Sequence, residues 1–205
     1  MSLALLGALA LLLAAAPGPD GSDAHLVAGA EAFRAGAYEK ALVEFRVAEA
    51  LGSAEASWYA AASLLQLGRA DDAVEAFVLA ERTTRTASDA LLVVYRGQAC
   101  YAARLYACAD RWFEWASSSA GPRLAPQLKA LRAAIREALQ PGQLAPVVDR
   151  LLGRAGELSA TRPALASAYA EEAVAMSARS PSRYREAEAT ALASRLAPTP
   201  PRGRR

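Results

Sequence analysis

The sequence predicts an all-α fold, an α-solenoid of stacked antiparallel helical hairpins, from three observations. Alanine, the best helix former, makes up about a quarter of the chain. β-branched residues, which favour strands, are sparse. A pattern of small and aromatic residues also recurs along the first half of the chain, and a fixed period of this kind is typical of helical repeat arrays.

Phenylalanine marks the repeat most clearly. Three of the four phenylalanines coincide when three segments are aligned without gaps: Phe45 in residues 35–50, Phe77 in 67–82 and Phe113 in 103–118. The steps between them are 32 and then 36 residues. Small residues coincide as well: Ala41, Ala73 and Ala109; Ala48, Ala80 and Ala116; and, upstream, Gly29, Ala61 and Gly97. Alanine matches are frequent in a chain this rich in alanine, so the phenylalanines decide.

Each copy predicts a helical hairpin. A small residue in the first helix lets a neighbouring helix approach closely, and the turn runs through Gly36 or Gly68 in two copies. In the second helix, an alanine three or four residues from the phenylalanine makes room for the ring between hairpins. One hairpin cannot bury both of its apolar faces, so we expect the copies to stack.

These residues resemble the tetratricopeptide repeat family. Some features depart from that pattern, since Arg104 stands at the turn position in the third copy, and the usual first-helix Trp/Leu pair and closing proline are missing from the first two. The resemblance implies a superhelix with three repeats in residues 25–122. Its matching residues are Gly29, Gly36, Tyr38, Ala41, Phe45 and Ala48; Ala61, Leu64, Gly68, Ala73, Phe77 and Ala80; and Gly97, Tyr106, Ala109, Phe113 and Ala116.

The second half, residues 123–196, predicts degenerate hairpins that continue or cap the solenoid. Apolar residues recur at helical spacing from Leu124 to Leu139, and Pro141-Gly142 then breaks the helix. A second stripe runs from Val147 to Leu158. A last pair of helices is expected in residues 163–178 and 182–196, and residues 197–205 are expected to form a disordered basic tail.

Residues 1–24 are predicted to be a signal peptide. The apolar run from Leu3 to Ala16 has the length of a signal-peptide core and is too short to span a bilayer comfortably. Ser22-Asp23-Ala24 offers a small-x-small cleavage site, which predicts export to a bacterial periplasm. The segment lacks Lys and Arg, so an uncleaved anchor in the inner membrane stays an alternative, as does a cytosolic protein with a misassigned start.

The chain offers no constellation of catalytic residues. His25 is the only histidine and lies beside the predicted cleavage site, which leaves no Ser/His or Cys/His pair and no zinc ligand set within a folded core. No glycine-rich phosphate loop is present. The net charge of +2, without a long block of one sign before the final residues, does not suggest nucleic-acid binding. We therefore predict a protein that is not an enzyme and has no metal or other cofactor.

Cys100 and Cys108 lie on opposite sides of the predicted third turn. Antiparallel packing of the two helices could bring them together as a disulfide that staples a hairpin whose turn lacks glycine. The alternative is two separate, half-buried thiols that behave as small apolar residues.

The resemblance places a partner-binding groove on the first helices, which line the concave surface in tetratricopeptide repeats. The family's carboxylate clamp is absent, because apolar residues such as Leu26, Ala30, Trp58 and Val94 stand where its polar side chains would be. An apolar, aromatic groove suits an amphipathic helix or an extended peptide. Alternatively, the chain's own C-terminal helices or a second copy fill it. By register the lining comprises Leu26, Ala30, Phe33, Trp58, Ala62, Leu65, Val94, Gln98 and Tyr101.

The sequence thus predicts a non-catalytic protein-interaction scaffold of the bacterial envelope that binds a protein or peptide through this groove. It predicts no nucleic-acid partner and, after cleavage of the signal, no membrane span. Two alternatives remain: a structural subunit of an oligomeric envelope complex, which involves self-association, and a module that binds a hydrophobic ligand. Trp112 and Trp115 flank Phe113 and are expected to pack between hairpins.

Overall fold

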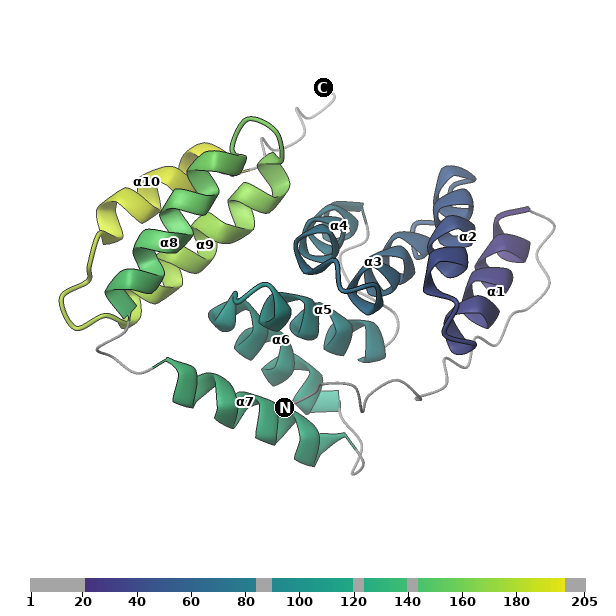
Figure 1. Cartoon of the computed structure of the whole chain (residues 1–205), viewed down its shortest axis with the longest axis horizontal. Helices are drawn as coiled ribbons and strands as arrows, with labels where there is room; N and C mark the ends of the chain where they lie inside the picture. Colours follow the sequence, from purple (N-terminus) through teal and green to yellow (C-terminus); the bar gives the residue numbers. More distant parts are fainter. Residues whose placement is uncertain (1–20, 84–89, 120–123, 140–143, 198–205) are drawn as a thin grey trace, which may run out of the picture. The chain divides into compact units, whose positions relative to one another are not determined.

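The fold is all-α, as predicted. A computed structural model describes residues 21–83, 90–119, 124–139 and 144–197, and within these ranges it contains ten helices and no strand. Within each of the two compact units of the chain, neighbouring helices pack against one another, consistent with an all-α, solenoid-like fold (Figure 1). The apolar run Leu3–Ala16, the break at Pro141-Gly142 and the tail from residue 198 onward lie outside the described residues.

The chain forms two compact units, Met1–Ala99 and Cys100–Arg205, which divide within α5. Within the second unit, α6 packs against α7 and α9. The helices of the first unit are α1 (Gly21–Arg34), α2 (Tyr38–Ala50), α3 (Ala56–Gln66), α4 (Ala70–Thr83) and most of α5 (Ala90–Ala102). Those of the second are α6 (Tyr106–Ser119), α7 (Ala125–Ala138), α8 (Leu144–Leu158), α9 (Pro163–Arg179) and α10 (Glu186–Leu196).

Helix α1 begins at Gly21, so the predicted end of the signal peptide after residue 24 falls inside its first turn. His25 lies in the next turn, and its Nδ1 atom is 2.7 Å from a carboxylate oxygen of Glu44 in α2. This contact joins the two helices of the first hairpin.

The three repeat turns have the same backbone geometry. The residue at the turn position has a positive φ in each: 76° at Gly36, 75° at Gly68 and 61° at Arg104. The amide of each turn residue donates to the carbonyl three residues earlier, and the next amide donates to the carbonyl five residues earlier. This is the hydrogen-bond pattern of a Schellman helix end. The helices on either side also end and begin in the aligned register, at residues 34, 66 and 102 and at residues 38, 70 and 106.

The aligned phenylalanines form the centre of the packing. Phe45, Phe77 and Phe113 each have 0% of their surface exposed. Gly29 of α1 lies against the ring of Phe45, and a Cβ atom at that position would stand 2.6 Å from the ring. The small residue of the first helix is therefore required by direct contact with the phenylalanine of the second.

A buried ion pair connects α4 and α5 in the first unit. Arg96 is only 3% exposed, its Nε donates to Glu81 at 2.6 Å, and its guanidinium lies 5.8 Å from the ring centre of Phe77. A charge this deeply buried requires such a partner. Periodicity in the sequence did not reveal this pair.

In the second unit, polar contacts join helices beyond the clear repeats. Arg132 of α7 donates to Asp110 of α6 at 2.8 Å. Helices α8, α9 and α10 pack in succession, and the Tyr184 hydroxyl just before α10 donates to Asp149 of α8. Helix α10 begins later than predicted, at Glu186, because Arg183 and Arg185 adopt positive φ values that end regular helix.

Two glycine-to-alanine substitutions test this packing. We expect Gly29→Ala to lower the free energy of unfolding by about 1–3 kcal/mol, because the added methyl overpacks the Phe45 ring. Gly153→Ala in α8 is the matched control. It has no atom within 4 Å of the new Cβ and should raise stability by about 0.5–1 kcal/mol through helix propensity. Urea unfolding followed by circular dichroism measures both; a harmless Gly29→Ala would contradict the packing.

Candidate partner-binding surface

The structure buries six of the nine residues predicted to line the groove, including Ala30 and Ala62. Trp58 is 1% exposed, Val94 2%, and Leu26 and Phe33 8% each. A side chain this buried has almost no surface to offer a partner. Leu65, Gln98 and Tyr101 are half-buried and remain accessible.

The chain's own aromatic residues cover the two largest of these side chains. Phe33 packs edge-on against Tyr38 at 5.2 Å and against Tyr95 at 5.8 Å between ring centres. Trp58 of α3 packs edge-on against Phe77 of α4 at 5.6 Å. Within the first unit, Phe33 and Trp58 therefore serve as core residues. The covering side chains belong to neighbouring helices of the repeats, and not to the C-terminal helices or the second copy that the sequence analysis named as alternatives.

Exposed apolar side chains instead lie on the second helices of the repeats. Leu79 of α4 is 47% exposed and Trp115 of α6 is 42% exposed, and both occupy one repeat position, which Val47 of α2 also occupies. Single exposed apolar residues are common, so the shared register is what makes Leu79 and Trp115 noteworthy; Val47 at the same position is half-buried. The alignment of the repeats already places these residues at one position, but the predicted groove included only first-helix residues.

The two neighbouring tryptophans of α6 have different environments. Trp112 is 9% exposed and packs within the second unit, as expected. Trp115 was expected to pack between hairpins, but it keeps 42% of its surface exposed and leans on Trp112, with ring centres 5.0 Å apart. Trp115 is thus partly exposed to solvent and packs against Trp112.

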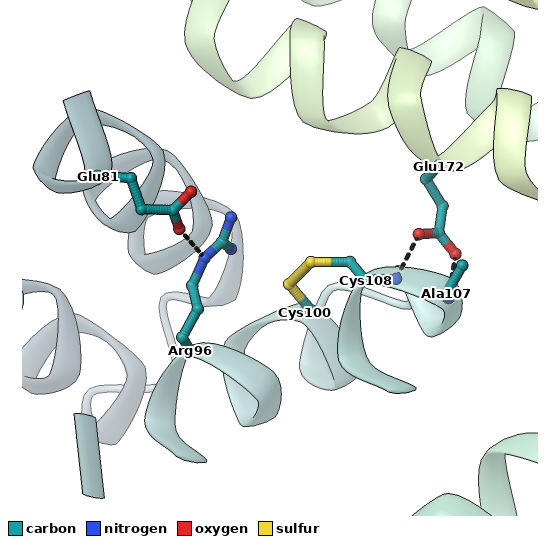
Figure 2. The surroundings of a disulfide bond; sticks show 6 residues. All are labelled: Glu81, Arg96, Cys100, Ala107, Cys108 and Glu172. Carbon is teal, nitrogen blue, oxygen red and sulfur yellow. Dashed lines mark hydrogen bonds and ion pairs between the residues drawn. A yellow bond between two sulfur atoms is a disulfide. The ribbon is translucent and has the colours of Figure 1, made fainter. Parts of the chain in front are cut away.

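Cys100 and Cys108 form a disulfide across the third repeat turn, which is the bonded one of the two predicted alternatives (Figure 2). Their Cα atoms are 5.8 Å apart. Cys100 is 0% and Cys108 9% exposed, so the bond is nearly enclosed. Tyr101 and Tyr106 pack edge-on beside it, with ring centres 5.8 Å apart.

Glu172 of α9 contacts the first turn of α6 beside this disulfide. One carboxylate oxygen accepts the Ala107 amide at 2.7 Å and the other accepts the Cys108 amide at 2.9 Å (Figure 2). The first amides of a helix have no acceptor within the helix, and the helix dipole favours a negative charge there. Glu172 therefore satisfies two such amides across 65 and 64 residues of sequence, a contact that no local pattern announces.

Burial dominates the electrostatics of Glu172. The residue is 3% exposed, and this burial raises its pKa above the ordinary value of 4.5. The amides of Ala107 and Cys108 and the charges of Arg179 and Arg111 act in the opposite direction. The shift upward shows that loss of solvent outweighs these four contributions.

Among the side chains that the structure describes, no three His, Cys, Asp or Glu residues are grouped as metal ligands. No helix within the described ranges has both the length and the apolar character needed to cross a bilayer.

Comparison with known proteins does not extend these observations. No protein-family model, curated protein or solved structure matches the chain.

Trp58 and Leu79 separate core from surface within the first unit. We expect Trp58→Ala to lower the free energy of unfolding by about 3–5 kcal/mol, because a buried tryptophan leaves a large cavity. Leu79→Ala, at an exposed site in the adjacent helix, should change it by no more than about 0.5–1 kcal/mol. Equal losses for the two variants, measured by chemical unfolding, would be inconsistent with Trp58 as a core residue.

Glu172 predicts a pH dependence of stability. Its folded-state pKa lies above its unfolded value, so its contribution is fully present below the ordinary carboxyl pKa and is lost as the pH rises through the folded pKa. From about pH 4 to about pH 8, the wild type should lose stability relative to Glu172→Gln, by about 1.4 kcal/mol for each unit of pKa shift. Unfolding curves of both proteins at each pH measure this difference. A constant difference would contradict a raised pKa.

Proposed function

We propose that the chain is a non-catalytic protein-interaction scaffold of the bacterial cell envelope, built on repeats that resemble the tetratricopeptide repeat. The observation that carries this proposal is the exposed apolar position of the second helices, occupied by Leu79 and Trp115. Leu79 belongs to the first unit and Trp115 to the second, so each is a separate candidate contact for a protein or peptide.

Burial of exposed apolar side chains favours binding. The free energy of binding becomes more favourable when a partner removes an exposed leucine or tryptophan from water. Tryptophan is also strongly enriched among the residues that dominate binding energies. Trp115 rests on Trp112, so less of its freedom is lost when a partner binds. The half-buried residues of the predicted groove, Leu65, Gln98 and Tyr101, supply a second, smaller surface.

Export to the periplasm belongs to the same proposal. A disulfide such as that between Cys100 and Cys108 persists in an oxidising compartment and is uncommon in a bacterial cytosol. Retention at the inner membrane by an uncleaved N-terminal segment would leave the scaffold in the same compartment. Mass spectrometry of the mature N-terminus distinguishes these two outcomes.

A structural subunit of an oligomeric envelope complex is the second candidate. The burial of Trp58 and Phe33 within the chain favours it, because it removes the aromatic groove as a docking site and leaves the exposed second-helix residues for a permanent interface. Analytical ultracentrifugation of the purified chain separates the two: a stable oligomer that Leu79→Asp dissociates supports the subunit.

Charge substitutions on the second helices test the scaffold. Biotinylated wild-type chain is incubated with envelope extract, and captured proteins are compared with those bound by Leu79→Asp and Trp115→Asp. We expect a specific partner to be lost at least about tenfold, since each aspartate places a charge in an apolar interface. Val43→Asp is the matched control, because Val43 is 61% exposed on α2 at a different repeat position.

Thermal unfolding of all three variants must match the wild type for the comparison to count. Capture that Val43→Asp weakens as much as Leu79→Asp and Trp115→Asp would contradict the shared position. Loss caused instead by Leu65→Ala or Tyr101→Ala would return the site to the predicted groove.

A further inference from the structure

The turn between α5 and α6 differs from the other two repeat turns in a linked way. Among the three aligned turns within the described chain, it alone has a residue other than glycine at the positive-φ position, and it alone carries cysteines. Ala32 and Leu64 occupy the positions equivalent to Cys100, and Lys40 and Asp72 those equivalent to Cys108. A positive φ is unfavourable for an arginine and neutral for a glycine. The third turn therefore has a disulfide across it, whereas in the other two turns glycine adopts the positive φ without strain.

This bond spans the turn that leads into α6. Cys100 lies in the last turn of α5, and its carbonyl accepts the Leu105 amide at 2.8 Å, while Cys108 lies in the first turn of α6. A disulfide across so short a loop restricts the alternatives open to the turn. The first-turn amides of α6 are therefore held in one direction.

Those amides are the contact that α9 uses. Glu172 accepts the amides of Ala107 and Cys108, and Cys108 is itself one end of the disulfide (Figure 2). The side chain that carries the sulfur and the amide that binds the carboxylate thus belong to one residue.

We propose that the Cys100–Cys108 disulfide is a redox-dependent latch that determines whether α9 docks on α6 through Glu172. In the oxidised chain, the first turn of α6 is fixed and the carboxylate is bound by both amides. In the reduced chain, Arg104 leaves the positive-φ region, the first turn of α6 frays and Glu172 loses both donors.

The redox step balances as a thiol–disulfide exchange. Closing the latch joins the two sulfurs, releases one proton from each thiol and transfers two electrons to the disulfide of an exchange partner, which becomes a dithiol. Opening it is the reverse, with a dithiol as reductant. Only the source of the oxidant in the cell rests on the proposed envelope location, and a purified glutathione couple replaces it in the experiment.

Hydrogen exchange of two amides reads the latch directly. The amides of Ala107 and Cys108 have no acceptor within α6, so their protection reports the Glu172 contact. The full chain is compared by NMR-detected exchange in oxidised and in reduced glutathione. Amides of α1–α4, in a part of the chain without cysteine, serve as the internal control for folding.

We expect reduction to lower the protection of these two amides at least about tenfold, which corresponds to about 1.4 kcal/mol. Glu172→Ala should lower it as far in the oxidised chain, and reduction should then have little further effect. Protection in the reduced wild type that stays within about twofold of the oxidised value would overturn the proposal.

A rescue variant tests the role of the turn. In a chain with Cys100→Ser and Cys108→Ser, protection should fall as it does on reduction. Adding Arg104→Gly to that chain should restore most of it, because glycine accepts the turn conformation that Gly36 and Gly68 adopt without a disulfide. Failure of the glycine to restore protection, with α1–α4 still protected, would show that turn geometry does not couple the disulfide to α9.

Discussion

The fit of one aromatic ring against one small residue governs the first hairpin. Phe45 is fully buried, and Gly29 leaves it room where a single methyl group would stand 2.6 Å from the ring. Phe77 and Phe113 occupy the same position in the next two second helices and are equally buried. Helices that approach this closely must end and turn at fixed places, so the contact sets the register of the turns as well as the packing.

The same packing decides which surfaces are left for function. Trp58 packs in the core against Phe77. Phe33 packs there against Tyr38 and Tyr95. These two aromatic side chains of first helices therefore stabilise the fold. The large apolar side chains that remain exposed include Val43 of α2, Leu51 just after it, Leu79 of α4 and Trp115 of α6. The repeat register therefore does not decide by itself where a partner could bind, because the aromatic residue at each position determines which side chains are buried.

The sequence predicted the elements because their causes are local. The phenylalanine spacing placed three second helices, and Gly36 and Gly68 marked turns that do have a positive φ. The groove could not be predicted to the same degree, since burial depends on which face of a helix its neighbours cover. Glu172 could not be found at all: its two donors lie more than sixty positions away in an unrelated stretch, and a glutamate on a helix ordinarily faces solvent.

The third hairpin shows what happens where the repeat pattern weakens. Arg104 replaces the turn glycine, and the hairpin loses a local source of stability. Two contacts absent from the earlier repeat turns stand at this point: a covalent bond across the turn and a buried carboxylate from α9. Both meet at Cys108, so neither is independent of the other. A glycine turn is stable under any redox condition, whereas this turn makes the attachment of the C-terminal helices depend on chemistry that the cell can change.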